Sequence, residues 1–66
     1  MQIYLNGVEK QIPDAYNMAK LIEFLDLSGQ RIAVEVNEEL VPRSTFNQHL
    51  LKEHDRVEII QAVGGG

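Results

Sequence analysis

The chain has 66 residues, a formal net charge of −4 and neither cysteine nor tryptophan. A chain of this length forms one small domain that buries only about 60% of the surface its unfolded form exposes. The absence of thiols excludes disulfides, cysteine metal ligands and a cysteine nucleophile. Leu, Ile, Val and Phe together supply 21 residues, which is typical of a folded chain. We therefore expect a single domain over residues 1–63 and a flexible glycine tail over residues 64–66.

The charge balance argues against nucleic acid as a partner. Ten acidic residues outnumber six basic ones, and no run of Lys or Arg offsets them. The longest apolar stretch is only a few residues, so we expect no membrane-spanning segment and no signal-peptide core. The lack of cysteine fits a reducing compartment. The predicted location is therefore the cytoplasm.

The first twelve residues predict a β-hairpin. Apolar and polar residues alternate over residues 2–6 and again over residues 8–12, with Asn6-Gly7 between the two runs. Asn-Gly at this position is typical of a type I′ turn, because both central residues of that turn need positive φ. Pro13 then ends the second strand.

An amphipathic helix is expected next. Asn17 is its predicted N-cap, with a side chain able to accept from a backbone N–H of the first turn. Four apolar residues then recur at the spacing of one helical face: Met18, Leu21, Ile22 and Leu25. We expect Phe24 and Leu27 to widen this buried face. Gly29 lies near the expected end of the helix.

Two more strands follow in the prediction. Residues 31–37 alternate strictly, with one apolar face formed by Ile32, Val34 and Val36. A turn over residues 37–39 leads into a short strand at Leu40-Val41, and Pro42 limits that strand to a position near a sheet edge.

The last third of the chain predicts a helical turn and a final strand. Ser44 and Thr45 can cap a single turn that carries three apolar residues into the core: Phe46, Leu50 and Leu51. A strand over residues 56–63 follows, with Val57 and Ile59 facing inward, and it leads directly into the glycines.

These elements define an α+β fold with the order β-β-α-β-β-(short helix)-β. The expected architecture is a mixed sheet of four to five strands curled over one main helix. The first and last strands are both strongly apolar, so we expect them to be neighbours at the centre of the sheet.

The titratable residues form no catalytic or metal-binding motif. His49 and His54 are five residues apart, which places them on different faces of any helix. The adjacent carboxylates of Glu38 and Glu39 lie in a predicted turn and are expected to point into water. We therefore predict no catalytic residue and no metal site in this chain.

The glycine ending is the feature most indicative of function. Gly64, Gly65 and Gly66 follow directly on a core strand and carry no side chain that would obstruct a narrow channel. The α-carboxylate of Gly66 is ionised at neutral pH. We expect the tail to place this carboxylate inside another protein's active site. The alternative is a frayed terminus without a function.

The sequence resembles the ThiS family of ubiquitin-like sulfur carriers, which have the β-grasp fold. The likeness runs over the whole chain and includes residues 1–7, 32–37, 40–44, 55–60 and 62–66. The Val-Asn-x-x-x-Val-Pro-Arg block combined with terminal glycines is specific. One position departs from the pattern, since His54 stands where the family often has Gly before Asp55. Histidine tolerates positive φ better than most residues, so the turn remains feasible.

The resemblance implies a protein that enzymes act upon and that is not itself an enzyme. An adenylating, E1-like enzyme would use ATP to adenylate Gly66, and a sulfur-delivering desulfurase system would convert the adenylate to a thiocarboxylate. Thiazole synthase would then take the sulfur for the thiamine thiazole ring. Gly64 and Gly65 would thread the partner's active site. The chain itself would bind no cofactor.

The sequence is also compatible with two other functions, and it predicts one docking surface. The small sulfur-carrier subunit of molybdopterin synthase shares the fold and the terminal Gly-Gly but is typically longer. A ubiquitin-like binding module without sulfur chemistry is the second alternative. Tyr4, Ile60 and Ala62 are expected to point outward and to form an apolar docking patch for partners, although scattered surface apolar residues are common in any protein.

Overall fold

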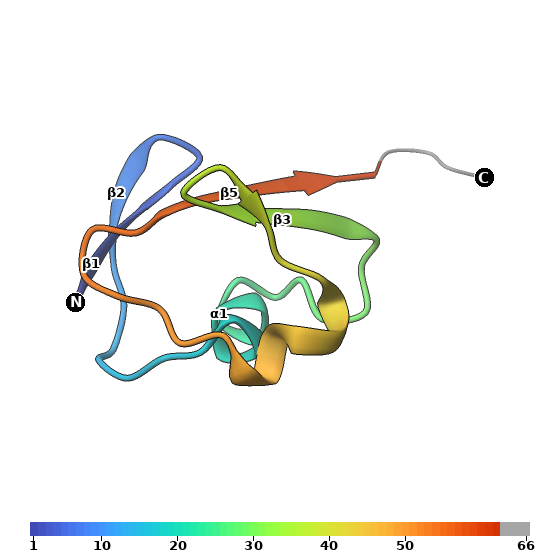
Figure 1. Ribbon diagram of the computed structural model, residues 1–66, viewed down its shortest axis with the longest axis horizontal. Coiled ribbons are helices and arrows are strands. Elements are labelled where there is room, and N and C mark those ends of the chain that lie inside the picture. The colour runs from blue at the N-terminus through green and yellow to red at the C-terminus, as the bar shows by residue number, and fades with distance from the viewer. Residues whose placement is uncertain (63–66) are drawn as a thin grey trace.

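The computed structural model describes residues 1–62. These residues form a five-stranded mixed sheet with its helices on one side (Figure 1). The elements in chain order are β1 (Gln2–Leu5), β2 (Val8–Gln11), α1 (Met18–Phe24), β3 (Ile32–Val36), β4 (Glu39–Leu40), the 3-10 helix η1 (Arg43–Gln48) and β5 (Arg56–Gln61). The strand order is β2-β1-β5-β3-β4, with β1 and β5 parallel and the other pairs antiparallel. The predicted α+β class and the central pairing of the first and last strands are confirmed.

The hairpin turn between β1 and β2 has the predicted geometry. Asn6 and Gly7 have φ of 50° and 83°, and the residues on either side of them, Leu5 and Val8, are paired. Positive φ at both central residues of a two-residue loop matches the right-handed twist of the strands.

The connection between β3 and β4 is also a two-residue turn with positive φ at both residues, although neither residue is glycine. Asn37 and Glu38 have φ of 51° and 71° and join the paired residues Val36 and Glu39. The short strand therefore begins at Glu39, earlier than the predicted start at Leu40, because the turn needs only two residues.

Helix α1 begins where the sequence predicts and ends earlier than expected. The side chain of Asn17 accepts a hydrogen bond from the backbone N–H of Lys20 at 2.8 Å, which confirms the predicted N-cap. The helix ends at Phe24, and Asp26 has a φ of 60°, which breaks the helical path before Gly29 is reached.

The prediction that Phe24 extends the buried face is wrong. This residue is 50% exposed, because it is offset around the helix from the buried face that Met18, Leu21 and Ile22 form. Its ring lies edge-on against Tyr16, and the Lys10 ammonium sits 5.6 Å from its centroid. Leu27, in contrast, packs against the core as expected.

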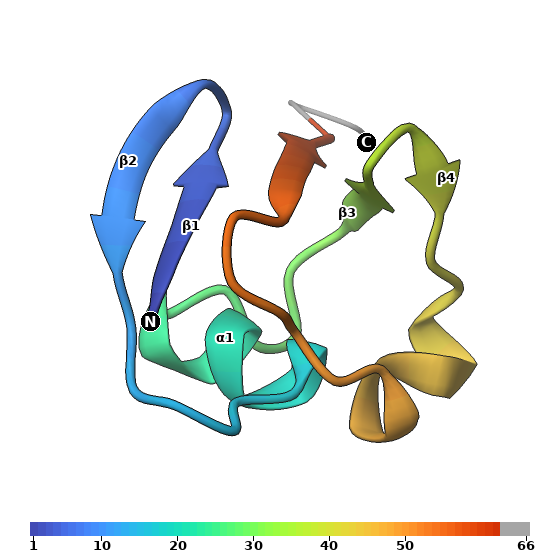
Figure 2. The same ribbon diagram turned by 60° about the vertical axis from the view of Figure 1, so that its left-hand side comes forward.

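The core fills the space between the inner face of the sheet and the two helices (Figures 1 and 2). Among the described residues the buried apolar side chains are Ile3, Ile12, Met18, Leu21, Ile22, Val34, Val36, Val41, Phe46, Leu51 and Val57. The expectation that Leu50 joins them is wrong, since it is 62% exposed. Helix η1 ends at Gln48, and in the extended segment that follows adjacent side chains point to opposite sides, so burying Leu51 turns Leu50 outward.

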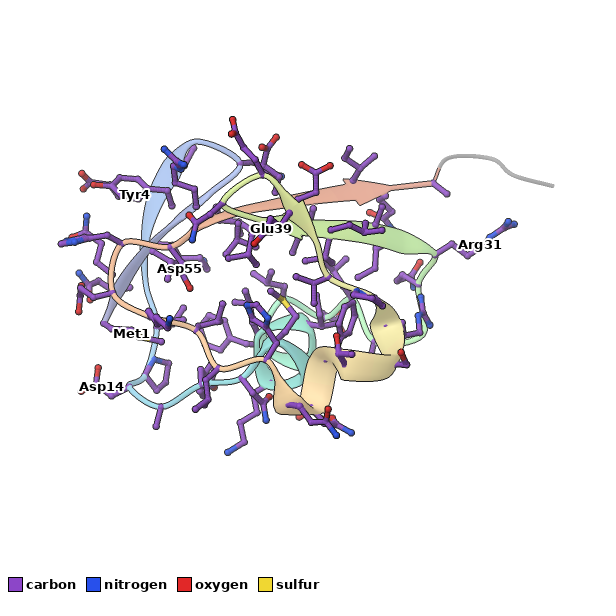
Figure 3. The ribbon with its side chains drawn as sticks, in the orientation of Figure 1. Met1, Tyr4, Asp14, Arg31, Glu39 and Asp55 are labelled. Carbon is purple, nitrogen blue, oxygen red and sulfur yellow. The ribbon has the colours of Figure 1, made fainter. Side chains whose placement is uncertain are left out.

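A buried carboxylate ties the start of β5 to the β3–β4 turn. Asp55, labelled in Figure 3, accepts from Asn37 Nδ2 at 3.0 Å and from the Lys52 backbone N–H at 2.9 Å. Asn37 Oδ1 in turn accepts from the backbone N–H of Arg56 at 3.0 Å. The preceding residue, His54, has a φ of 70°, so this position does require positive φ.

Candidate functional site

The site of interest is the end of β5, from which the chain continues into residues 63–66. Gly64, Gly65 and Gly66, the predicted reactive tail, lie outside the described residues. The backbone N–H of Ala62 donates to the carbonyl oxygen of Arg31 at 2.8 Å, which fastens the last described residue to the segment that leads into β3. Figure 3 shows Arg31 at the end of the molecule where β5 leaves the sheet.

A small hydrogen-bonded group holds this end of the sheet together. Gln61 Nε2 donates to Gln30 Oε1 at 3.2 Å, and the Arg43 guanidinium donates to the carbonyl oxygen of Gln30 at 2.7 Å. The loop before β3, the start of η1 and the end of β5 are thereby joined. The position from which the tail starts is therefore fixed by three separate segments.

The three predicted docking residues lie on the outer face of the sheet, opposite the helices. Ile60 is 64% exposed, Ala62 is exposed and Tyr4 is half-buried. Tyr4 and Ile60 line a hollow of about 800 Å³ on this face, and Ile60 and Ala62 line a second hollow of about 400 Å³. Ile60 therefore lines both hollows, whereas Tyr4 and Ala62 line one each.

Neighbours of this patch were not predicted from the sequence. Ala33 is paired directly with Ile60, and Arg31 and Arg43 line the hollow that Ile60 shares with Ala62. The alternation of β3 indicates that Ala33 faces outward, but its pairing with Ile60 depends on the register between strands distant in sequence. Only the folded sheet reveals that register.

The carboxylates of Glu38 and Glu39 and the side chain of His54 lie at the surface. Glu38 and Glu39 are exposed in and beside a turn. His54 Nε2 lies 3.9 Å from Glu53 Oε2, with both side chains exposed. Within residues 1–62, no three His, Asp or Glu side chains gather into a possible metal site, and no helix is both long and apolar enough to span a bilayer.

The mixed sheet curled over one main helix, with a central last strand that leads into a glycine ending, defines a ubiquitin-like β-grasp protein. The crystal structure of a thiamine biosynthesis protein (ThiS) from Geobacter metallireducens superimposes with a TM-score of 0.85 at 28% identity, covering 100% of both chains. The sequence profile of the ThiS family matches residues 3–66. The chain belongs to the ThiS family, the sulfur carriers of thiamine biosynthesis.

Two relatives place the chain within this family. The sulfur carrier protein ThiS of Escherichia coli is 30% identical over 66 residues, which cover 100% of both proteins. A thiazole synthase of Paramagnetospirillum magneticum is 32% identical over all of this chain, which corresponds to only 20% of that longer protein. These matches favour the thiamine assignment over the molybdopterin alternative.

Proposed function

We propose that the chain carries sulfur as a thiocarboxylate on Gly66. The observation that supports this proposal best is the position of β5, the central strand of the sheet. It ends at Gln61, and only Ala62 and Val63 separate it in the sequence from the terminal glycines of a ThiS-family chain. The four residues after Ala62 can span at most about 14 Å when extended. The folded domain can therefore stay outside an enzyme while its last residue reaches the active site.

The chemistry follows from the poor leaving ability of a carboxylate oxygen. An oxygen of the Gly66 carboxylate attacks the α-phosphorus of ATP, pyrophosphate leaves, and an acyl-adenylate forms. A sulfide equivalent from a desulfurase system then attacks the carbonyl carbon and AMP leaves, which gives the thiocarboxylate. The adenylating enzyme binds ATP, and the carrier contributes only its terminal carboxyl group and a surface to be recognised.

Gly64 and Gly65 are proposed to pass through the narrowest part of the enzyme's active site, where a Cβ atom would obstruct the chain. Ordering backbone costs about 1–2 kcal/mol per residue, so contacts elsewhere must offset several kcal/mol. The outer-face patch of Tyr4, Ile60 and Ala62 is the proposed source of those contacts. One residue of this patch, Ala62, precedes Gly64 by only two positions, so the patch lies close to the tail.

Thiazole synthase is the proposed sulfur acceptor. The thiazole synthase relative contains a region similar to this whole chain within one longer polypeptide. A single polypeptide that holds both parts keeps the carrier close to its acceptor. The adenylating enzyme, the desulfurase system and the thiazole synthase are all proposed to meet the carrier in the cytoplasm.

Carrier-dependent exchange of labelled pyrophosphate into ATP, catalysed by the adenylating enzyme, tests the proposal. We expect exchange with the chain ending at Gly66 and none when one alanine is added after Gly66. Thermal unfolding of the extended chain is the control, and it should match that of the original. Undiminished exchange with the extended chain would contradict the role of a free carboxylate at Gly66.

A further inference from the structure

Strand β5 continues past the end of β1, the strand that pairs with it on one side. Its backbone pairing with β1 covers only Tyr4 with Arg56 and Leu5 with Val57, whereas its pairing with β3 continues to Gln61. Figure 1 shows β5 continuing beside β3 past the end of the β1–β2 hairpin. Within the described residues, the part of β5 beyond the hairpin therefore has a neighbouring strand on one side only.

The side chain of Asn6 ends the parallel ladder at Ile59. The Asn6 backbone N–H donates to Val57 O at 2.8 Å, so a continued ladder would have Ile59 N–H donate to the Asn6 carbonyl. Instead Asn6 Oδ1 accepts from Ile59 N–H at 2.9 Å, and Asn6 Nδ2 donates to Ile59 O at 3.3 Å. The amide of this side chain thus takes the place of the next peptide group of β1.

Gln61 is the next residue whose backbone faces this side of β5. In an antiparallel ladder alternate residues bond to a given neighbour, and Arg56 and Ala62 bond toward the β3 side. The backbone N–H and C=O of Gln61 therefore point toward the β1 side. Among residues 1–62 no strand lies alongside Gln61 there.

Hollows lie on both faces of this edge. On the inner side a hollow of about 250 Å³ is lined by Leu5, Asn6, Leu25, Leu27, Ile59 and Gln61. On the outer side, Asn6, Gly7, Ile59 and Ile60 contribute to the 800 Å³ hollow that includes Tyr4. Side chains of an added strand alternate between the two faces of a sheet. Both faces of this edge therefore have room for them.

We propose that an extended segment of the adenylating enzyme adds to the sheet at this edge. It pairs with the backbone of Gln61 and places an apolar side chain in the hollow that Leu5, Leu25 and Leu27 line. Main-chain hydrogen bonds supply affinity in such strand addition, and the hollows supply selectivity. The proposal rests on the proposed function. Because Gly66 lies only four residues beyond Ala62, the enzyme that receives it must contact this end of the sheet.

Amide hydrogen exchange measured by NMR tests the proposal on the unaltered protein. In the free carrier we expect the Gln61 amide to exchange much faster than the Ile60 amide, which faces β3. Addition of the adenylating enzyme should slow exchange at Gln61. Unchanged exchange in the complex would overturn the proposal. Slower exchange of the Gln61 amide at a higher concentration of the carrier alone would also overturn the proposal, because it would show that a second copy occupies the edge.

Substitution of Gln61 gives an independent test. Gln61→Pro removes the N–H that faces the open edge and leaves the ladder with β3 intact, as proline is tolerated at such positions. We expect the carrier concentration for half-maximal pyrophosphate exchange to rise about tenfold, the effect of one backbone hydrogen bond. Gln61→Ala removes the same side chain, including its bond to Gln30, but keeps the N–H. It is the matched control, and the tenfold rise is expected relative to this variant.

The outcomes separate the two proposals. Pyrophosphate exchange that is equal for Gln61→Pro and Gln61→Ala would overturn strand addition and leave the sulfur-carrier proposal standing. Absence of exchange with the wild-type chain would overturn the sulfur-carrier proposal itself. Thermal unfolding shows whether Gln61→Pro is folded, and if it is not, the hydrogen-exchange result on the wild type decides.

Discussion

Replacing Asn37 by alanine should remove a large part of the stability of this small domain. The amide of Asn37 donates to the buried carboxylate of Asp55 and accepts from the backbone N–H of Arg56, both at 3.0 Å. We assign about 1.5 kcal/mol to the bond with the charged group and about 0.5 kcal/mol to the exposed one. Alanine at a φ of 51° adds about 1 kcal/mol of strain. The predicted loss is therefore about 3 kcal/mol.

Thermal unfolding monitored by circular dichroism measures this loss. For a domain of this size about 1 kcal/mol lowers Tm by about 4–8 °C, so Asn37→Ala should lower Tm by about 12–24 °C. Asn37→Gly is the matched variant, because it removes the same hydrogen bonds and accepts positive φ without strain. It should lose about 1 kcal/mol less than Asn37→Ala. Equal losses would refute the strain contribution, and a loss below about 1 kcal/mol for Asn37→Ala would refute the whole account of this turn.

Two further pairs of variants test the division between surface and core. Ile60→Glu should leave Tm nearly unchanged and weaken activation by the adenylating enzyme, measured as the carrier concentration for half-maximal exchange, whereas the equally exposed Leu50→Glu should change neither quantity. An equal effect of both substitutions on activation would contradict the assignment of the outer-face patch. Phe46→Ala should cost about 3–5 kcal/mol in urea unfolding, and Phe24→Ala should cost about 1 kcal/mol or less, because its ring is half exposed. A larger loss for Phe24 than for Phe46 would show that the core is assigned incorrectly.

The sequence predicts most of the fold where local chemistry decides it. The Asn6-Gly7 turn and the Asn17 cap depend on interactions within a few residues, and the structure has both. The errors at Phe24 and Leu50 have a different origin. Both residues are apolar and close to core positions in the sequence. Phe24 is offset around α1 from the buried face, whereas Leu50 points outward because η1 ends at Gln48 and Leu51 is the buried residue of the extended segment that follows.

At the candidate site, too, some features follow from the local sequence and others depend on the folded sheet. Alternation along the last strand places Ile60 on the outer face, and the structure agrees. The open edge beside Gln61 follows from the relative lengths of β1 and β5 and from the amide of Asn6 replacing a peptide group. These are long-range features of the sheet, and no local pattern in the sequence encodes them.

We propose that the reacting group of this carrier is its terminal carboxyl group. The decisive measurement is intact-mass spectrometry after incubation with ATP, the adenylating enzyme and a sulfur source. We expect a mass increase equal to the replacement of one oxygen by sulfur, located by fragmentation to Gly66. An unchanged mass with active enzyme present, or sulfur attached to any other residue, would contradict it.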